Sequence, residues 1–264
     1  MIMDEELKKH ACFGLLDECV EFYDRLSFST YGFITTGISA GIGMPFNLDS
    51  DIFLSISGTM KSIKRNLYNG QINDAYTLIR KYYDVIIINI YEIVLFKTEL
   101  NIENFIVEKI DKWLKGKEKL PRIKEMNILI RKCIDLKNIN KILDKDKRYE
   151  KIRDRCNDHI HCNYFQYMQL NSKIDVQNGK VYIDLINDDL LDLIVLHFAY
   201  LFTLNGHYMT SSNYIDCLDL NIEPEEDSKY WVAPFIQEFF DKFIKTRRPD
   251  ISKEIVNKTF MYLE

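Results

Sequence analysis

Glycine and proline are scarce in this chain of 264 residues, which contains ten glycines and five prolines. Disordered and low-complexity chains are enriched in both, so the scarcity favours a folded, helix-rich body. The six cysteines are dispersed, and no two of them form a C-x-x-C pair. Dispersed cysteines of this kind are typical of reduced thiols in a cytoplasm.

Long apolar runs are also missing. The longest, Val85–Phe96 and Leu190–Leu204, are too short to span a bilayer and are interrupted by polar residues. The first residues, Met1–Glu6, are acidic where a secretory signal would be basic. The sequence therefore predicts a cytoplasmic protein with no membrane segment.

Apolar residues make up 47% of the chain, and most recur at helical spacing. With Ser, Asp, Asn, Gly and Pro as boundary signals, the pattern predicts a mainly α protein in one helical domain, 1–264. An alternation of apolar residues around Asn178-Gly179 is typical of a β-hairpin and predicts one over 173–185. Helices are expected over 5–26, 49–68, 73–100, 101–115, 121–133, 146–170, 188–204, 231–244 and 251–262.

Charge is distributed unevenly. The net charge is −5, yet residues 107–155 contain seventeen Lys and Arg against nine Asp and Glu. A basic stretch of this kind suits a nucleic-acid surface, although a solvated lysine-rich helical face explains it about as well.

The basic stretch ends in a run that concentrates polar groups, Ile152–Asn163, with two of the five histidines. On one helix, Arg153, Asn157 and His161 fall within about 80° of one another, and Arg155 and His159 form a second stripe. Arginine offers a fixed cationic fork for phosphate, and histidine transfers protons near neutral pH.

An arginine followed after several residues by a histidine resembles the RX4-6H motif of the HEPN superfamily (higher eukaryotes and prokaryotes nucleotide-binding). Arg153-Asp154 with His159 matches its pattern, and Arg155-Cys156 with His161 matches the spacing but has cysteine in the polar position. The resemblance implies a HEPN-like helical bundle with its core at about 49–172. The hairpin and C-terminal helices, 173–264, are additions to that core.

The resemblance further implies a metal-independent endoribonuclease that acts as a homodimer, needs no cofactor and belongs to prokaryotic antiviral defence or a toxin–antitoxin pair. A histidine would move the proton as the RNA 2′-hydroxyl attacks its own phosphate, while an arginine stabilises the equatorial oxygens. Asn157 or Asp158 would orient the imidazole. Which arginine and histidine react stays open, and some HEPN proteins are noncatalytic. The alternative is a helical module that binds nucleotide, nucleic acid or a protein partner. The candidate site residues are Arg153, Arg155, Asn157, Asp158, His159 and His161.

Two further patterns are weaker. Cys156, His159, His161 and Cys162 are zinc-compatible types, but one helix cannot close a tetrahedron from four such neighbours. Gly37–Gly41 matches the G-x-S-x-G nucleophile elbow without the strand and parallel sheet that this motif needs.

Overall fold

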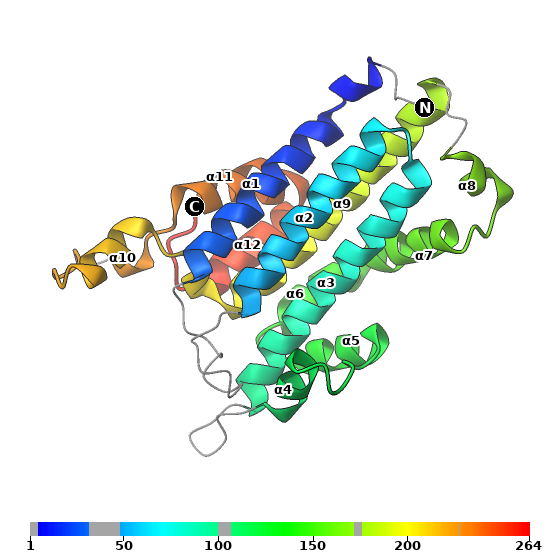
Figure 1. Ribbon diagram of the computed structural model, residues 1–264. Coiled ribbons are helices and arrows are strands. Elements are labelled where there is room, and N and C mark those ends of the chain that lie inside the picture. Colours follow the sequence, from blue (N-terminus) through cyan, green and yellow to red (C-terminus); the bar gives the residue numbers. More distant parts are fainter. Residues whose placement is uncertain (1–4, 32–47, 100–106, 172–175, 227) are drawn as a thin grey trace. The chain divides into compact units, whose positions relative to one another are not determined.

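A computed structural model describes residues 5–31, 48–99, 107–171, 176–226 and 228–264, and within them the chain is almost entirely helical (Figure 1). The single β pairing in these ranges is an isolated bridge between Thr210 and Val232. The mainly α fold predicted from the sequence is confirmed. The G-x-S-x-G pattern lies outside the described ranges, and the HEPN-like core stays a prediction.

The described residues group into two compact units. Unit 1 comprises 5–31, 48–89, 147–171 and 176–193, and unit 2 comprises 90–99, 107–146, 194–226 and 228–264. Two long helices, α3 (Ile72–Glu99) and α9 (Val176–Leu204), contribute residues to both units.

Unit 1 begins with a short 3-10 turn, η1 (Leu7–Lys9), and the helices α1 (Ala11–Tyr31) and α2 (Leu48–Tyr68), which pack beside the first part of α3 (Figure 1). Their buried polar groups pair across the interfaces. The hydroxyls of Tyr23 and Tyr82 lie 2.8 Å apart, and Asn89 donates a hydrogen bond to Asp49. Apolar residues at i, i+3 and i+4 bury one face of each helix, as the predicted periodicity requires.

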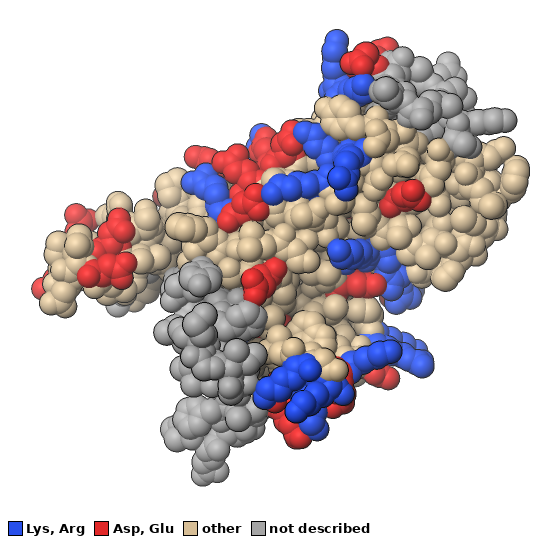
Figure 2. Space-filling view, viewed as in Figure 1, with Lys and Arg blue, Asp and Glu red and all other residues tan. Residues whose placement is uncertain are grey.

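The outer surface of α1 and α2 carries both signs of charge close together (Figure 2). Lys64 contacts Asp17 at 2.6 Å and Lys61 contacts Asp24 at 3.1 Å across the two helices. Exposed pairs of this kind contribute little, about 0.2–1 kcal/mol each. The mixed charge makes this face a poor candidate for a phosphate-binding surface.

The hairpin predicted over 173–185 is wrong for residues 176–185, which form the start of α9; residues 172–175 lie outside the described ranges. The residues that alternate as a strand also continue a helical pattern through Ile183, Ile186 and Leu190, which are all fully buried. Burying three such side chains stabilises the helix by roughly 1.5–3 kcal/mol each, which outweighs the local turn preference of Asn178-Gly179.

The helix predicted over 146–170 is two helices, α7 (Arg148–Ile160) and α8 (Phe165–Gln169). Cys162 has a φ of 48°, a left-handed conformation that no α-helix continues through. The break lies directly after His161, so the second predicted histidine sits at the end of α7 and not within it.

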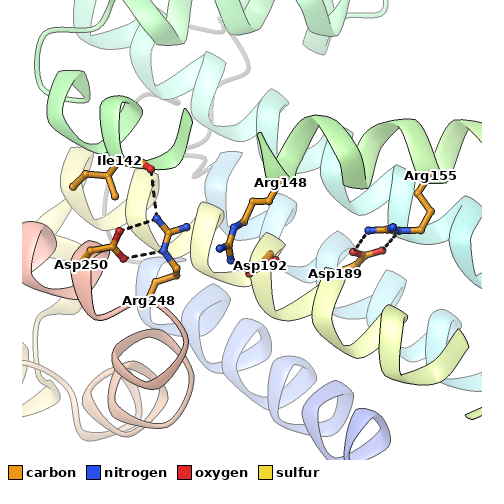
Figure 3. A network of polar contacts seen from close by, with 7 residues as sticks. All are labelled: Ile142, Arg148, Arg155, Asp189, Asp192, Arg248 and Asp250. Carbon is orange, nitrogen blue, oxygen red and sulfur yellow. Dashed lines mark hydrogen bonds and ion pairs between the residues drawn. The ribbon is translucent and has the colours of Figure 1, made fainter. Parts of the chain in front are cut away.

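Unit 2 contains shorter helices around the ends of α3 and α9. Arg248 donates two hydrogen bonds to Asp250 and a longer one of 3.4 Å to the carbonyl of Ile142 (Figure 3). These bonds connect α12 (Pro249–Lys258) to α6 (Lys137–Leu143). The predicted helix over 231–244 begins at Pro234 and becomes π-helical. The elements of unit 2 are α4 (Glu108–Leu114), α5 (Ile123–Lys132), α6 (Lys137–Leu143), η3 (Asp144–Asp146), η4 (Gly206–Met209), α10 (Ser212–Asp219), η5 (Ser228–Tyr230), α11 (Pro234–Phe239), the π-helix η6 (Phe240–Lys245) and α12 (Pro249–Lys258).

None of the helices in the described ranges combines the length and the apolar character that crossing a bilayer demands.

Candidate functional site

Helix α7 is a strongly polar helix whose two predicted stripes have different surroundings. The inner stripe, Arg155 and His159, is anchored to α9 and α3 within unit 1. The outer stripe, Arg153, Asn157 and His161, is less buried and lies beside α3. Because successive residues turn by about 100°, the sequence fixes the two stripes but not their direction in the fold.

Arg155 is held by a carboxylate. Its Nε and Nη2 donate hydrogen bonds of 2.8 Å to the two carboxylate oxygens of Asp189 on α9 (Figure 3). The Asp189 side chain is only 4% exposed. Burial raises the pKa of this carboxyl, and the guanidinium opposes that rise. The guanidinium of Arg155 therefore favours the ionised form of the buried carboxyl.

A second arginine of α7, Arg148, also pairs with an aspartate of α9. Arg148 donates a 2.7 Å hydrogen bond to Asp192, three residues after Asp189 on α9 (Figure 3). Two charge-assisted contacts thus join α7 to α9. They make Arg155 part of the helix–helix contact, which is a structural role.

His159 is enclosed by aromatic rings. Its imidazole stacks between Tyr76 and Tyr167 with ring centroids 3.9 Å and 4.0 Å away, and Tyr182 approaches edge-on at 6.4 Å. Burial, helped by the nearby Arg155, lowers the pKa of His159 to about 4. The ring is therefore neutral at physiological pH.

A hydrogen bond fixes the tautomer of His159. Its Nδ1 lies 2.9 Å from Oδ1 of Asn73. An amide oxygen only accepts hydrogen bonds, so Nδ1 carries the proton and donates it. Asn171 in turn accepts hydrogen bonds from the backbone N–H groups of Asn73 and Asp74, at 3.0 Å and 3.4 Å, and so caps the start of α3.

The outer stripe meets an arginine of α3. Arg80 donates a hydrogen bond of 2.5 Å from Nη1 to Oδ1 of Asn157 and another of 2.9 Å from Nε to Asp84. Arg80 and Asp84 are four residues apart on α3, the spacing at which opposite charges pair on a helix. The guanidinium of Arg80 is thereby placed beside α7, one helical turn before His161.

Arg153 adds a second cation to this surface. Its closest carboxylate contact is a loose one, 3.7 Å from Nη2 to Asp154, and its buried Nε has no hydrogen-bond partner among the described residues. Burial raises the pKa of Asp84, while Arg80 and Arg153 both oppose the rise. Arg153 therefore lies near Asp84 with donor capacity still unused.

His161 differs from His159 in its accessibility. It is exposed at the C-terminal end of α7, and within the described part of the chain its imidazole makes no hydrogen bond or ring contact. The carboxylate of Asp158 accepts a 2.7 Å hydrogen bond from Asn163, on the other side of the turn. Asp158 thus stabilises the end of α7, and its charge opposes the fall in the pKa of His159.

The structure brings Arg153, Asn157 and His161 onto one face with Arg80, and it separates Arg155 and His159 from that face. Sequence reasoning missed Asn73, Tyr76, Tyr167 and Asp189. Of these, only Asp189 had a local signal, because an acid within an apolar helix needs a partner.

The zinc-compatible residues do not gather. Cys156 is buried, where burial raises the pKa of its thiol to about 12, and all six cysteines are free. Across the described ranges, no group of three or more His, Cys, Asp or Glu side chains is placed to hold one ion. The acidic residues that follow Ser212, which include Asp216 and Glu223, are exposed and scattered over α10 and the segment after it.

No protein-family model matches this chain, and comparisons with curated proteins and with solved structures give no significant match. The functional argument therefore depends on the site itself.

Proposed function

We propose that this protein is a metal-independent endoribonuclease of the HEPN type, and that the outer stripe of α7 with Arg80 forms its active surface. The observation that carries the proposal is the Arg80 guanidinium bound to Asn157, four residues before the exposed imidazole of His161. Four residues correspond to about 6 Å along a helix, so one phosphate reaches both groups.

The chemistry follows from these groups. His161 accepts the proton of the RNA 2′-hydroxyl as this oxygen attacks the adjacent phosphorus. The bond from phosphorus to the 5′-oxygen breaks, water protonates that oxygen, and a 2′,3′-cyclic phosphate remains. Arg80 stabilises the charge on the equatorial oxygens through its positive charge and the N–H groups that Asp84 and Asn157 leave free. DNA lacks the attacking hydroxyl and is bound without being cut.

Arg153 fits a dimeric arrangement. It lies eight residues from His161, about 12 Å along the helix, so the two do not share a phosphate on one chain. A second copy, with its α7 antiparallel to the first, would bring its own Arg153 to this His161. Homodimerisation, a cytoplasmic location, a defence or toxin setting and a partner protein complete the proposal on the strength of the motif resemblance.

A noncatalytic binding module is the second candidate. The observation that favours it is the placement of Arg155 and His159, two of the six candidate site residues, in a buried ion pair and an aromatic stack. In this candidate function, the outer stripe binds phosphate groups without cleaving a phosphodiester bond. Binding without cleavage by the wild-type protein would support this candidate.

The test is RNA cleavage in EDTA with analysis of the product ends. The wild type should leave 2′,3′-cyclic phosphates, and His161→Ala and Arg80→Lys should each lower the rate at least about 100-fold, in the range of a lost proton-transfer group. His159→Phe serves as the matched histidine control and should retain cleavage. RNA methylated at its 2′-oxygens should resist the wild type.

Three results would overturn the proposal. The first is full activity of His161→Ala with correct folding by circular dichroism. The second is loss of activity in EDTA. The third is cleavage of 2′-O-methylated RNA, because that substrate has no free nucleophile.

A further inference from the structure

The segment that follows His161 exposes aromatic side chains. Tyr164 is 57% exposed, and Phe165, the first residue of α8, is 73% exposed. Two neighbouring rings exposed in this way are available to a binding partner. The exposed rings and the outer stripe of α7 both belong to unit 1.

The rings are held on a rigid base. Tyr164 packs edge-on against Tyr167, with centroids 5.5 Å apart and an interplanar angle of 87°. Tyr167 stacks on His159, which stacks on the buried Tyr76. The aromatic column therefore runs from the core of unit 1 to the surface, where Tyr164 ends it, and Phe165 is the next residue in the chain. In this arrangement His159 supports Tyr167 by stacking, a role that requires no proton transfer.

The distance to the reactive groups is short. Three peptide units separate His161 from Tyr164, so their Cα atoms lie at most about 11 Å apart. The turn at Cys162 and the hydrogen bond from Asn163 to Asp158 keep this connection compact. Nucleotides next to a phosphate at His161 reach these rings.

We infer that Tyr164 and Phe165 form a stacking platform for unpaired bases, so that the protein selects single-stranded RNA. The inference rests on the proposed function for its choice of RNA. Stacking requires an open π-face, which bases in a duplex do not offer. The guanidinium of Arg80, which contacts α7 one turn before His161, complements the phosphate backbone of a strand that passes His161. Exposed aromatic rings combined with cations are usual in single-strand binding.

Binding is measured apart from cleavage. The His161→Ala protein is titrated into a fluorescein-labelled 12-nucleotide single-stranded RNA, and anisotropy gives the Kd. Adding Tyr164→Ala or Phe165→Ala should weaken binding roughly 5- to 100-fold for each ring, the range for one lost base stack. Tyr164→Trp should restore it. A blunt RNA duplex of the same sequence should bind no tighter than the Phe165→Ala variant binds the single strand.

Phe28 provides the matched control. It is an aromatic residue of unit 1 that is 87% exposed, on α1, and Phe28→Ala should leave the Kd unchanged. Phe165→Ala is the decisive variant, since truncating Tyr164 removes a ring that touches Tyr167. Sedimentation of each variant shows whether the rings instead contact a second copy.

The outcomes separate the two ideas. If the wild type cuts no RNA while Phe165→Ala still weakens binding, the platform stands and the nuclease proposal fails. If RNA is cut while both alanine variants bind within twofold of their parent, the platform is wrong. A shift from dimer to monomer in Phe165→Ala, with unchanged RNA affinity, would assign the surface to a second copy of the chain and overturn the inference.

Discussion

Replacing Arg155 with alanine should destabilise the protein far more than replacing another arginine with the same pairing geometry. Arg155 donates two hydrogen bonds of 2.8 Å to Asp189, whose side chain is 4% exposed. Arg131 donates two hydrogen bonds of 2.8 Å and 2.9 Å to Asp144, but these side chains are 52% and 48% exposed. The two pairs differ mainly in burial.

The expected magnitudes follow from that difference. Arg155→Ala leaves a buried carboxylate without its countercharge, which should lower the free energy of unfolding by about 3–5 kcal/mol. Arg131→Ala breaks a solvated pair and should lower it by less than about 1 kcal/mol. The double variant Arg155→Met/Asp189→Leu removes both charges and should recover most of the loss, because it leaves no unpaired buried ion.

Urea denaturation followed by circular dichroism measures these values. The deficit of Arg155→Ala should shrink as the pH is lowered. The pKa of Asp189 is already raised in the folded protein, and losing the guanidinium raises it further, so protonation removes the buried charge at acid pH. The loss of unfolding free energy caused by Arg155→Ala is absent at pH values below the pKa of aspartate in the unfolded chain. It is complete at pH values above the pKa of Asp189 in the folded variant. Equal, small losses for Arg155→Ala and Arg131→Ala would refute the structural role of the inner stripe.

Two further predictions concern the same unit. Asn171→Ala removes the side chain that caps α3, and it should cost about 0.5–2 kcal/mol in urea denaturation and speed hydrogen exchange at Asn73 and Asp74; unchanged exchange there would contradict the cap. By NMR, His159 should show Nδ1 protonation and titrate near pH 4. Because the pKa of His159 is depressed in the folded protein, its contribution to the free energy of unfolding should be present above the unfolded pKa of about 6.5. That contribution should be lost as the pH falls through about 4. His159→Phe should reduce this acid sensitivity, and titration of His159 near pH 6.5 would show that the ring is not enclosed.

Helix content and helix positions followed from local patterns. The predicted helices over 49–68 and 73–100 agree with α2 and α3 to within a residue, because long apolar periodicity between clear boundary residues leaves one choice. Local signals failed where they were brief. Asn178-Gly179 lies inside α9, and the break after His161 lacks the glycine or proline that marks most helix ends.

The candidate site shows the same division. Its location at the end of the basic stretch and its two stripes follow from residue type and helical spacing alone. Reading Arg80 as a partner of Asp84 also needed only their separation of four residues. The sequence could not show which stripe is buried in helix contacts and which stays accessible, because each arginine and each histidine has the same chemistry in isolation.

The sequence by itself therefore determined a mainly helical chain with arginine and histidine on two different faces of one helix. Only the tertiary structure decided which face turns inward. That choice depends on Asp189 and Asn73, which lie 34 and 86 residues from their partners. The buried carboxylate of Asp189 and the side-chain amide of Asn73 become partners of α7 only when distant helices pack together. The energy that orients α7 arises from that packing.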